Sequence, residues 1–120
     1  MKKVETINAP IAVGPYSQAL IAGEFVFCSG QIGIDPKTNE LVEGIEKQTK
    51  RVMNNLKAVL KMANGGFENV VKTEIFLTDI NDFTTVNEIY GSFFVNDPKP
   101  ARQTVVVAKL PKNALIEISC

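Results

Sequence analysis

Two charged residues near the end of the chain lie in or beside apolar segments, and the first of them is Arg102. It opens the β-prone part of PARQTVVVAKLP, residues 100–111, and it is one of two arginines beside eleven lysines. A guanidinium holds a carboxylate through two parallel hydrogen bonds, which the ammonium group of lysine cannot reproduce. This residue type at a strand end indicates either a structural salt bridge or a grip on the carboxylate of a small ligand.

Glu117 is the second of these residues, and it interrupts the apolar segment 114–119. On a strand with one wet face the glutamate would simply point to solvent. If that face is instead buried between subunits, the carboxylate loses water and its pKa rises, as a general base that activates water requires. The residues alone leave both interpretations open.

Four further residues are candidates for a binding site. Tyr16 in VGPYS would either close a pocket with its ring or serve only in packing. Ser29 and Gly30 end a predicted strand, where glycine either lets a ligand approach the backbone N–H or forms a turn. Asn87 lies at the edge of a predicted helical stripe, where it would either hold a polar contact or be solvated.

Composition narrows the chemistry. Histidine is absent, which excludes Ser–His and Cys–His relays and leaves too few ligands for a convincing zinc site. Any acid–base step must then use a carboxylate, tyrosine, lysine or thiol. The formal net charge is zero, so no general attraction to nucleic acid or anionic membrane is expected. The start of the chain lacks the apolar core of a signal peptide and no apolar stretch reaches transmembrane length, which predicts a cytoplasmic protein.

The two cysteines, Cys28 and Cys120, lie far apart in the sequence and form no CxxC motif. They either pair with one another or remain reduced, with Cys28 buried and Cys120 at the terminus. The second interpretation is the simpler one.

Two helices are expected to position these residues. Apolar residues recur at helical spacing from about Ile45 until Asn64-Gly65-Gly66, where glycine would supply a left-handed C-cap. A second helix is predicted to begin at a capping residue, Asn81 or Asp82, and to stop before Asp97-Pro98. The inner stripes are Val52, Met53, Leu56, Val59, Leu60 and Ala63 on the first helix, and Phe83, Val86, Tyr90 and Phe93 on the second.

The strands are expected around these helices, in the order βββαβαββ. One side of the strand at 70–78 should carry Val71, Thr73, Ile75 and Leu77, and the segment DPKTNE should be a loop. The other strands are predicted at 3–6, in a hairpin over 18–30 that turns at Gly23-Glu24, at 103–108 and at 114–119.

This order predicts one α+β domain, residues 1–120, with two helices on one face of a mixed β-sheet. The segments 25–28 and 105–107 are apolar on both strand faces, but two helices can cover only one face. An apolar sheet face left in water is unfavourable, so we expect a homo-oligomer whose sheets face inward.

Six segments together resemble one family over essentially the whole chain: VGPYSQA, CSGQIGIDP, NLKAVL, VVKTEIFLTDINDFTTVNEIY, PAR and AKLPKNALIEI. Their order and spacing are similar to those of the RidA (YjgF-type) proteins, reactive intermediate deaminases that act on imines. The resemblance implies a chorismate-mutase-like α+β fold, a homotrimer, and active sites in the clefts between subunits.

The resemblance also implies roles for individual residues. Arg102 would grip the substrate carboxylate, and Glu117 would act with the hydrolytic water. Many family members have cysteine where this chain has Thr104, whose backbone carbonyl could still hold a water. The remaining residues of the implied pocket are Tyr16, Ser29, Gly30 and Asn87.

The activity implied is hydrolysis of 2-imino acids derived from enamines, such as 2-iminobutanoate and 2-iminopropanoate, to 2-keto acids and ammonia. Imines are already electrophilic, so no metal or cofactor is expected. Two alternatives stay open: a non-catalytic regulator that binds small carboxylates, and a ribonuclease or translation inhibitor, which the balanced charge supports poorly. A chorismate mutase would rest on fold analogy alone, and arginine is nearly absent from the chain.

Overall fold

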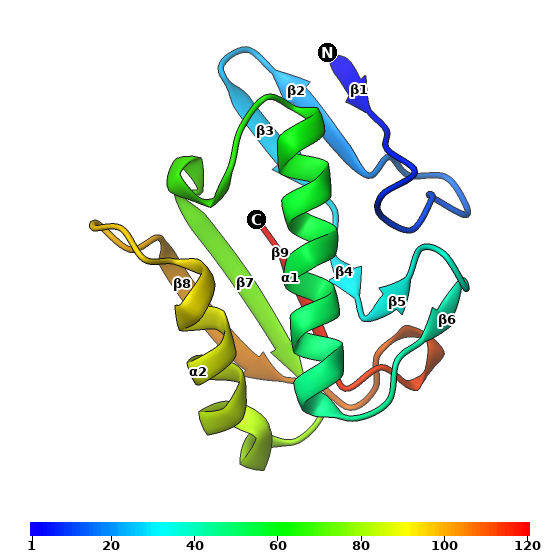
Figure 1. Ribbon diagram of the computed structural model, residues 1–120, viewed down its shortest axis with the longest axis vertical. Helices are drawn as coiled ribbons and strands as arrows, with labels where there is room; N and C mark the ends of the chain where they lie inside the picture. Colours follow the sequence, from blue (N-terminus) through cyan, green and yellow to red (C-terminus); the bar gives the residue numbers. More distant parts are fainter.

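The computed structural model describes residues 1–120 and shows short strands arranged around two helices (Figure 1). The strands are β1 (Lys2–Val4), β2 (Ala19–Ala22), β3 (Phe25–Cys28), β4 (Gln31–Ile32), β5 (Ile34–Asp35), β6 (Glu40–Leu41), β7 (Lys72–Leu77), β8 (Ala101–Val106) and β9 (Ile116–Ser119). The α-helices are α1 (Ile45–Met62) and α2 (Phe83–Phe93), and the 3₁₀ helices are η1 (Phe67–Asn69), η2 (Ile80–Asp82) and η3 (Pro111–Asn113).

The predicted hairpin is confirmed. Strands β2 and β3 pair antiparallel from Ala19 opposite Cys28 to Ala22 opposite Phe25, and β1 adds to β2 as a third strand. The turn falls at Gly23-Glu24, where Gly23 adopts a φ of 61°. Glycine has no Cβ, so it accepts this left-handed conformation at little cost.

The sheet that carries the candidate residues is mixed. Its strand order is β4-β9-β7-β8, with β7 parallel to β8 and antiparallel to β9. Strand β8 begins at Ala101, two residues before the predicted start, because Ala101 already pairs with Lys72 of β7. The parallel β7–β8 pair is connected through α2, as parallel strands require.

Three strands before the first helix were not predicted. DPKTNE does not form a plain loop, because its two ends lie in strands that pair as Ile34 with Leu41 and Asp35 with Glu40. Strand β4 pairs with β9, which lies at the other end of the sequence. Two-residue strands carry too little periodicity to be recognised, and their existence depends on distant partners.

Helix α1 buries the predicted stripe. Val52, Met53, Leu56, Val59 and Leu60 are buried, and Ala63 is partly buried just after the last turn. The first helix ends near the predicted place, but the residue in the left-handed conformation is not a glycine as predicted. Asn64 adopts the left-handed conformation, with a φ of 62°, and Gly65 then donates to the carbonyl of Leu60 at 2.9 Å. Asparagine tolerates this conformation because its short polar side chain can hydrogen-bond locally.

The start of α2 also differs from its prediction. Asp79 supplies the cap, because its Oδ1 accepts the N–H of Asn81 at 2.9 Å and begins η2. Asp82 occupies the position before α2 but makes no capping hydrogen bond with its side chain. The inner stripe is confirmed: Val86 and Tyr90 are buried, and Phe83 and Phe93 at its two ends are partly buried.

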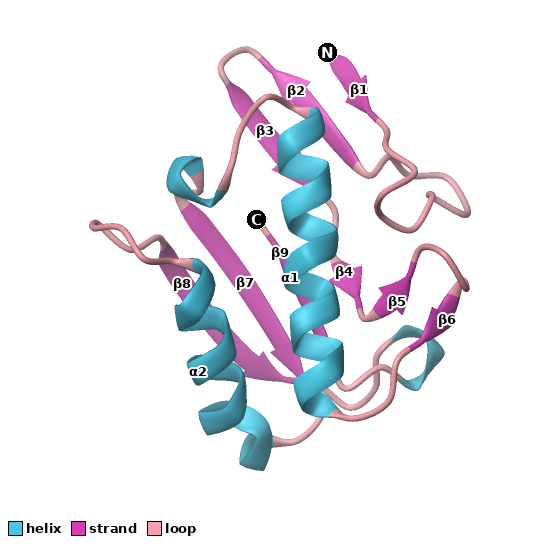
Figure 2. Ribbon diagram, in the orientation of Figure 1, coloured by secondary structure: helices cyan, strands magenta, loops and turns pink.

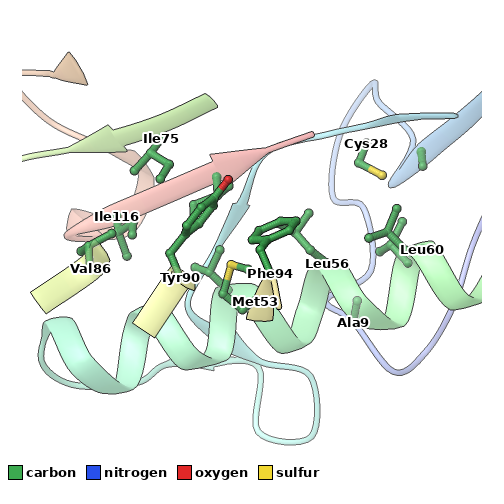
Figure 3. Packing of buried hydrophobic residues seen from close by; sticks show 14 of the residues in the cluster. Ala9, Cys28, Met53, Leu56, Leu60, Ile75, Val86, Tyr90, Phe94 and Ile116 are labelled. Carbon is green, nitrogen blue, oxygen red and sulfur yellow. The ribbon is translucent and has the colours of Figure 1, made fainter. Parts of the chain in front are cut away.

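Both helices cover the same face of the β7–β8–β9 strands (Figures 1 and 2). The core lies between these layers, and Figure 3 shows Ile75, Ile116, Met53 and Leu56 packed together there. Val71 was predicted on the buried side but is 70% exposed, since it precedes β7. The two larger sheets are joined by one backbone hydrogen bond between them, from Cys28 N to Cys120 O at 2.8 Å.

Apolar side chains remain exposed away from the helices. Phe25 and Phe27 are each 62% exposed, and Val105 on the edge strand β8 is 42% exposed. The apolar surface anticipated from the sequence is therefore uncovered in a single chain, and oligomerisation stays a prediction. Neither α1 nor α2 combines the length and apolar character needed to span a bilayer.

Candidate functional site

Arg102 and Glu117 lie on opposite faces of the same sheet. Arg102 pairs with Thr73, whose side chain is buried under the helices, whereas Glu117 pairs with Phe76 on the other face. Paired residues share a face and successive residues alternate, so the register fixes this separation. Strand β7 also stands between β8 and β9. One chain therefore does not bring the two charged side chains together.

The first group, which we call the arginine cluster, consists of Arg102, Asn87, Tyr90 and Phe83. The guanidinium donates through Nη1 to Asn87 Oδ1 at 2.7 Å. Its Cζ lies 5.1 Å from the Tyr90 ring centroid and 5.8 Å from that of Phe83, within the range of cation–π attraction. Asn87 is therefore not a solvated flank of α2, because it orients the arginine.

The Tyr90 hydroxyl is hydrogen-bonded to Thr73 Oγ1 at 2.7 Å, which ties the cluster to β7. Burial raises the pKa of this phenol, so it stays protonated. Tyr90 was predicted only as a packing residue. Its spacing of three positions from Asn87 on one helix could have shown that both side chains approach the same strand.

No carboxylate is paired with Arg102 in the protomer. The two salt bridges join Lys3 to Glu5 and Lys99 to Asp97, both at the surface. The structural salt bridge considered from the sequence is therefore absent, and the guanidinium is free to bind another acceptor. A hollow of about 290 Å³ beside it is lined by Asn87, Tyr90, Gly91, Phe94, Lys99, Pro100 and Arg102.

Thr104 lies on the same sheet face as Arg102, two residues along β8. It pairs with Ile75, and its Oγ1 is buried without a hydrogen-bond partner. An unsatisfied buried hydroxyl costs about 1–3 kcal/mol, so it marks a place where a water or a ligand atom would be stabilised. Thr104 thus offers a free polar atom on the sheet face that carries the arginine cluster.

The second group, which we call the glutamate cluster, consists of Glu117, Gly30 and Ser29. Glu117 follows the fully buried Ile116 on the central strand β9, and its own side chain is half-buried even in the single chain. Burial raises the pKa of this carboxyl above its ordinary value of 4.5. In the single chain Glu117 thus lies on the face away from the helices but is only partly solvated, so both interpretations stay open.

Gly30 provides the space for the glutamate. A Cβ at this position would lie 2.8 Å from both Cδ and Oε2 of Glu117, closer than real side-chain contacts allow. Any larger residue would have to displace the carboxylate. Gly30 therefore leaves the space that the Glu117 carboxylate occupies, which is a more specific role than the turn considered from the sequence.

Ser29 and Gly30 form a β-bulge rather than a turn. Gln31 pairs with Ile118, yet three residues earlier Cys28 donates to Cys120, which is only two residues beyond Ile118 and directly follows β9. One extra residue therefore lies on the β3–β4 side, as in a bulge. Ser29 is anchored there, because its N–H donates to Gln18 O at 2.9 Å and its hydroxyl donates to Ser17 O at 2.5 Å.

The chain entering β9 is held by a residue that sequence reasoning did not identify. Gln48 on α1 is buried, and its Oε1 accepts the N–H of Leu115 at 2.8 Å. A buried glutamine on an otherwise apolar helix stripe was the available signal, since buried amides are hydrogen-bonded. Gln48 thus helps to position Glu117 two residues later.

Tyr16 belongs to neither cluster. Its ring is 54% exposed, and its hydroxyl accepts the N–H of Val13 at 3.4 Å within the same loop. Whether Tyr16 closes a pocket or serves only in packing therefore still depends on what covers this surface. No group of three or more histidine, cysteine, aspartate or glutamate side chains is arranged to hold a metal ion.

Comparison with known proteins places these features in context. The model of the family described as Endoribonuclease L-PSP matches residues 6–120. A RutC family protein of Synechocystis is 52% identical over 122 residues, which cover 100% of this chain and 94% of the relative. Reactive Intermediate Deaminase A, a chloroplastic protein of Arabidopsis thaliana, is 50% identical over 118 residues, covering 98% of this chain and 63% of the plant protein.

Among solved structures, E. coli TdcF with bound serine superimposes with a TM-score of 0.94 at 40% sequence identity. The match covers 99% of this chain and 95% of TdcF. The layers and strand order described above are thus those of a known fold, seen there with a small amino acid bound.

Proposed function

The chain belongs to the Endoribonuclease L-PSP family, which includes the RutC and RidA proteins, and from this premise we propose that it hydrolyses 2-imino acids to 2-keto acids and ammonia. The substrates proposed are 2-iminobutanoate and 2-iminopropanoate, formed from enamines. The observation that carries the proposal is the presence of two complementary groups: a guanidinium without a carboxylate partner and a half-buried carboxyl with a raised pKa.

In this proposal Arg102 binds the substrate carboxylate through its free N–H groups. Asn87 and the rings of Tyr90 and Phe83 hold the guanidinium in place, so little entropy is lost when the substrate binds. The positive charge also draws electron density from the adjacent imine carbon. The serine bound to TdcF has the same arrangement of a carboxylate next to a nitrogen-bearing carbon, which supports a ligand of this class.

Glu117 would act as the general base. Its ionised carboxylate takes a proton from water as the oxygen attacks the carbon of the protonated imine, giving a neutral carbinolamine. The protonated carboxyl then gives this proton to the amino nitrogen. The carboxylate next takes the hydroxyl proton as the C=O bond of the 2-keto acid forms, the C–N bond breaks and ammonia leaves; the carboxyl finally releases its proton to solvent. A carboxyl whose pKa is raised by burial is a stronger base than an ordinary one, and it serves in each of these proton transfers.

The two clusters lie on opposite faces of one sheet, so we propose that each complete site forms between subunits. One subunit would contribute its arginine cluster, and its neighbour would contribute Glu117, Gly30 and Ser29, with Tyr16 closing the pocket. Two different surfaces of one chain that pair head to tail generate a closed ring when the rotation from one subunit to the next closes. We propose a homotrimer, located in the cytoplasm, with its exposed apolar strand faces turned inward and without nucleic-acid or membrane partners.

The test generates 2-iminobutanoate in solution and follows its decay with and without the protein. The decay should accelerate with wild type and return to the uncatalysed rate with Arg102→Ala. If the assembled wild-type oligomer leaves the decay unchanged for both proposed imines, the hydrolase proposal fails, and the carboxylate-binding regulator becomes the better account.

The family description favours ribonuclease activity, whereas the net charge of zero does not. The family carries an endoribonuclease name, while the acidic and basic residues are equal in number, at thirteen each. RNA binding that weakens steeply with salt would favour that alternative, because phosphate contacts release counterions. Imine hydrolysis in a small pocket that binds one carboxylate should instead be the same in the presence of excess RNA.

A further inference from the structure

The two cysteines meet where the two larger sheets join. Cys28 ends β3 and donates its N–H to the carbonyl of Cys120 at 2.8 Å. The two residues thus lie opposite one another on antiparallel segments, where Cα atoms are about 4.5–5.5 Å apart. This spacing lies within the range that a disulfide spans.

The bulge is what creates this pair. In the register set by Gln31 opposite Ile118, Cys120 would face Ser29. The extra residue at Ser29-Gly30 moves Cys28 into that position instead. A cross-strand pair of thiols therefore exists because of the same backbone irregularity that places Gly30 against Glu117.

Both side chains lie on the core face. Cys28 is 8% exposed and belongs to the buried cluster, at the same end as Leu60 in Figure 3, and Cys120 packs against that cluster. Opposite residues of antiparallel strands project to the same side, so the two thiols lie on the same face of the paired segments.

The thiols differ in acidity. A hydrogen bond from the Cys120 thiol lowers the pKa of Cys28, against the opposing effect of burial. The same hydrogen bond and burial raise the pKa of Cys120. Cys28 is therefore the member of the pair that becomes a thiolate, and the thiolate is the nucleophilic form of cysteine.

A small oxidant can reach the pair. A groove of about 570 Å³ between β3, the end of α1 and the start of β7 is lined by both cysteines, together with Phe25, Leu60 and Lys72. In the single chain the groove is open to solvent and far larger than a peroxide molecule, so burial of the sulfur atoms does not by itself block access.

We propose that Cys28 and Cys120 are a peroxide-reactive dithiol that closes to an intramolecular disulfide. The Cys28 thiolate attacks one oxygen of hydrogen peroxide, the O–O bond breaks, and the released hydroxide takes a proton to become water. Cys120 then attacks the resulting sulfenic sulfur, the S–S bond forms, and the second hydroxide leaves with the Cys120 proton as water. Two thiols and one peroxide thus give one disulfide and two waters.

The disulfide would join the two segments that carry the glutamate cluster. Cys28 directly precedes Ser29 and Gly30, and Cys120 follows Glu117 by three residues. In the reduced protein these segments are held together near the cysteines by one backbone hydrogen bond. Oxidation would replace that contact with a covalent link beside the bulge. This inference does not depend on the proposed imine hydrolysis.

The experiment treats the reduced protein with hydrogen peroxide and measures free thiols and intact mass without reductant. We expect both thiols of each chain to disappear and the mass of the single chain to fall by about 2 Da, since two hydrogen atoms leave. Trypsin should then yield residues 4–37 linked to residues 113–120, and a reductant should separate them.

Two matched variants assign the roles. Cys120→Ser should stop at a Cys28 sulfenic acid that a 1,3-dione probe traps, whereas Cys28→Ser should leave Cys120 unmodified under the same exposure. Thiols that persist in wild type, a disulfide between chains, or Cys120 reacting as fast without Cys28 would each overturn the proposal. If a serine variant does not fold, the mass and thiol count of wild type decide the question alone.

Discussion

The arginine cluster and the glutamate cluster are built in different ways. Arg102 extends from the edge strand β8, is exposed, and is oriented by a hydrogen bond and two aromatic rings from α2. Glu117 lies on the central strand β9, and its carboxylate occupies space that the missing side chain of Gly30 leaves open. The comparison indicates that the exposed edge strand is suited to ligand binding, while the interior strand carries the carboxyl group that takes up and releases protons.

The largest effect is expected from Arg102→Ala. Two charge-assisted hydrogen bonds to the substrate carboxylate would be lost, about 1.5–3 kcal/mol each, so kcat/KM should fall roughly 10²–10⁴-fold. Arg51→Ala is the matched control, because Arg51 bonds only Asn55 on α1. Equal losses in both variants, measured as initial rates of imine decay, would show that Arg102 has no special role.

Glu117→Gln should follow, with a loss of about 10²–10³-fold in kcat. The free energy of unfolding of the Glu117→Gln variant, in contrast, should not fall at neutral pH. The raised pKa means that the folded state disfavours the ionised carboxyl, so this penalty is present above the raised pKa and disappears as pH falls below the ordinary value of 4.5. The amide cannot ionise.

Thermal melts at several pH values check this expectation. The Glu117→Gln variant should melt at or above the wild-type temperature at pH 7, and the difference should vanish near pH 4. Wild-type activity should also fall as pH drops through the raised pKa. Glu40→Gln, an exposed strand glutamate, should show none of these changes. A variant that is less stable at pH 7 would contradict the burial argument.

Gly30→Ala tests whether the glutamate cluster depends on precise placement. The new Cβ would force the Glu117 carboxylate to move, and a displacement of about 1 Å can cost up to 10²-fold, so we expect a 10–10²-fold loss of kcat with little change in KM. Gly65→Ala is the control, since its nearest atom is 3.4 Å away. If Gly30→Ala retains full kcat, Gly30 does not position the glutamate.

The smallest effect is expected from Thr104→Val. Removing a buried hydroxyl that lacks a partner should stabilise the protein by about 1 kcal/mol, measured by denaturant unfolding. If that hydroxyl contacts the substrate or a water, activity should fall less than tenfold, consistent with one neutral hydrogen bond. A destabilised variant would instead mean that Thr104 Oγ1 has a partner in the assembled protein.

Sequence reasoning identified the elements with long periodic patterns. The apolar stripe of α1 is regular enough to be recognised. Arg102 stands out as a scarce arginine at the start of a β-prone segment, and Glu117 stands out because it interrupts an apolar one. The bulge at Ser29-Gly30 and the opposite faces of the two charged residues were not predicted. Both depend on register, which is set by pairing between strands far apart in the chain and leaves no local signal.

The same limit explains the errors at the helix ends. At the start of α2 the cap is Asp79, because its side chain is the one placed to accept the Asn81 N–H. At the end of α1 the left-handed position falls on Asn64, one residue before the glycines, and asparagine tolerates this conformation. The short strands β4, β5 and β6 were missed for lack of length.

The claim that each site is shared between subunits is tested most directly by mixing two inactive variants. Arg102→Ala and Glu117→Gln chains are unfolded together in equal amounts and refolded, or expressed together, and imine decay is measured. If a site takes its arginine from one subunit and its glutamate from the next, about a quarter of the sites in the mixed oligomers have both residues, and about a quarter of wild-type activity should return. If each chain held a complete site by itself, the mixture would stay as inactive as its components, and the account would be wrong.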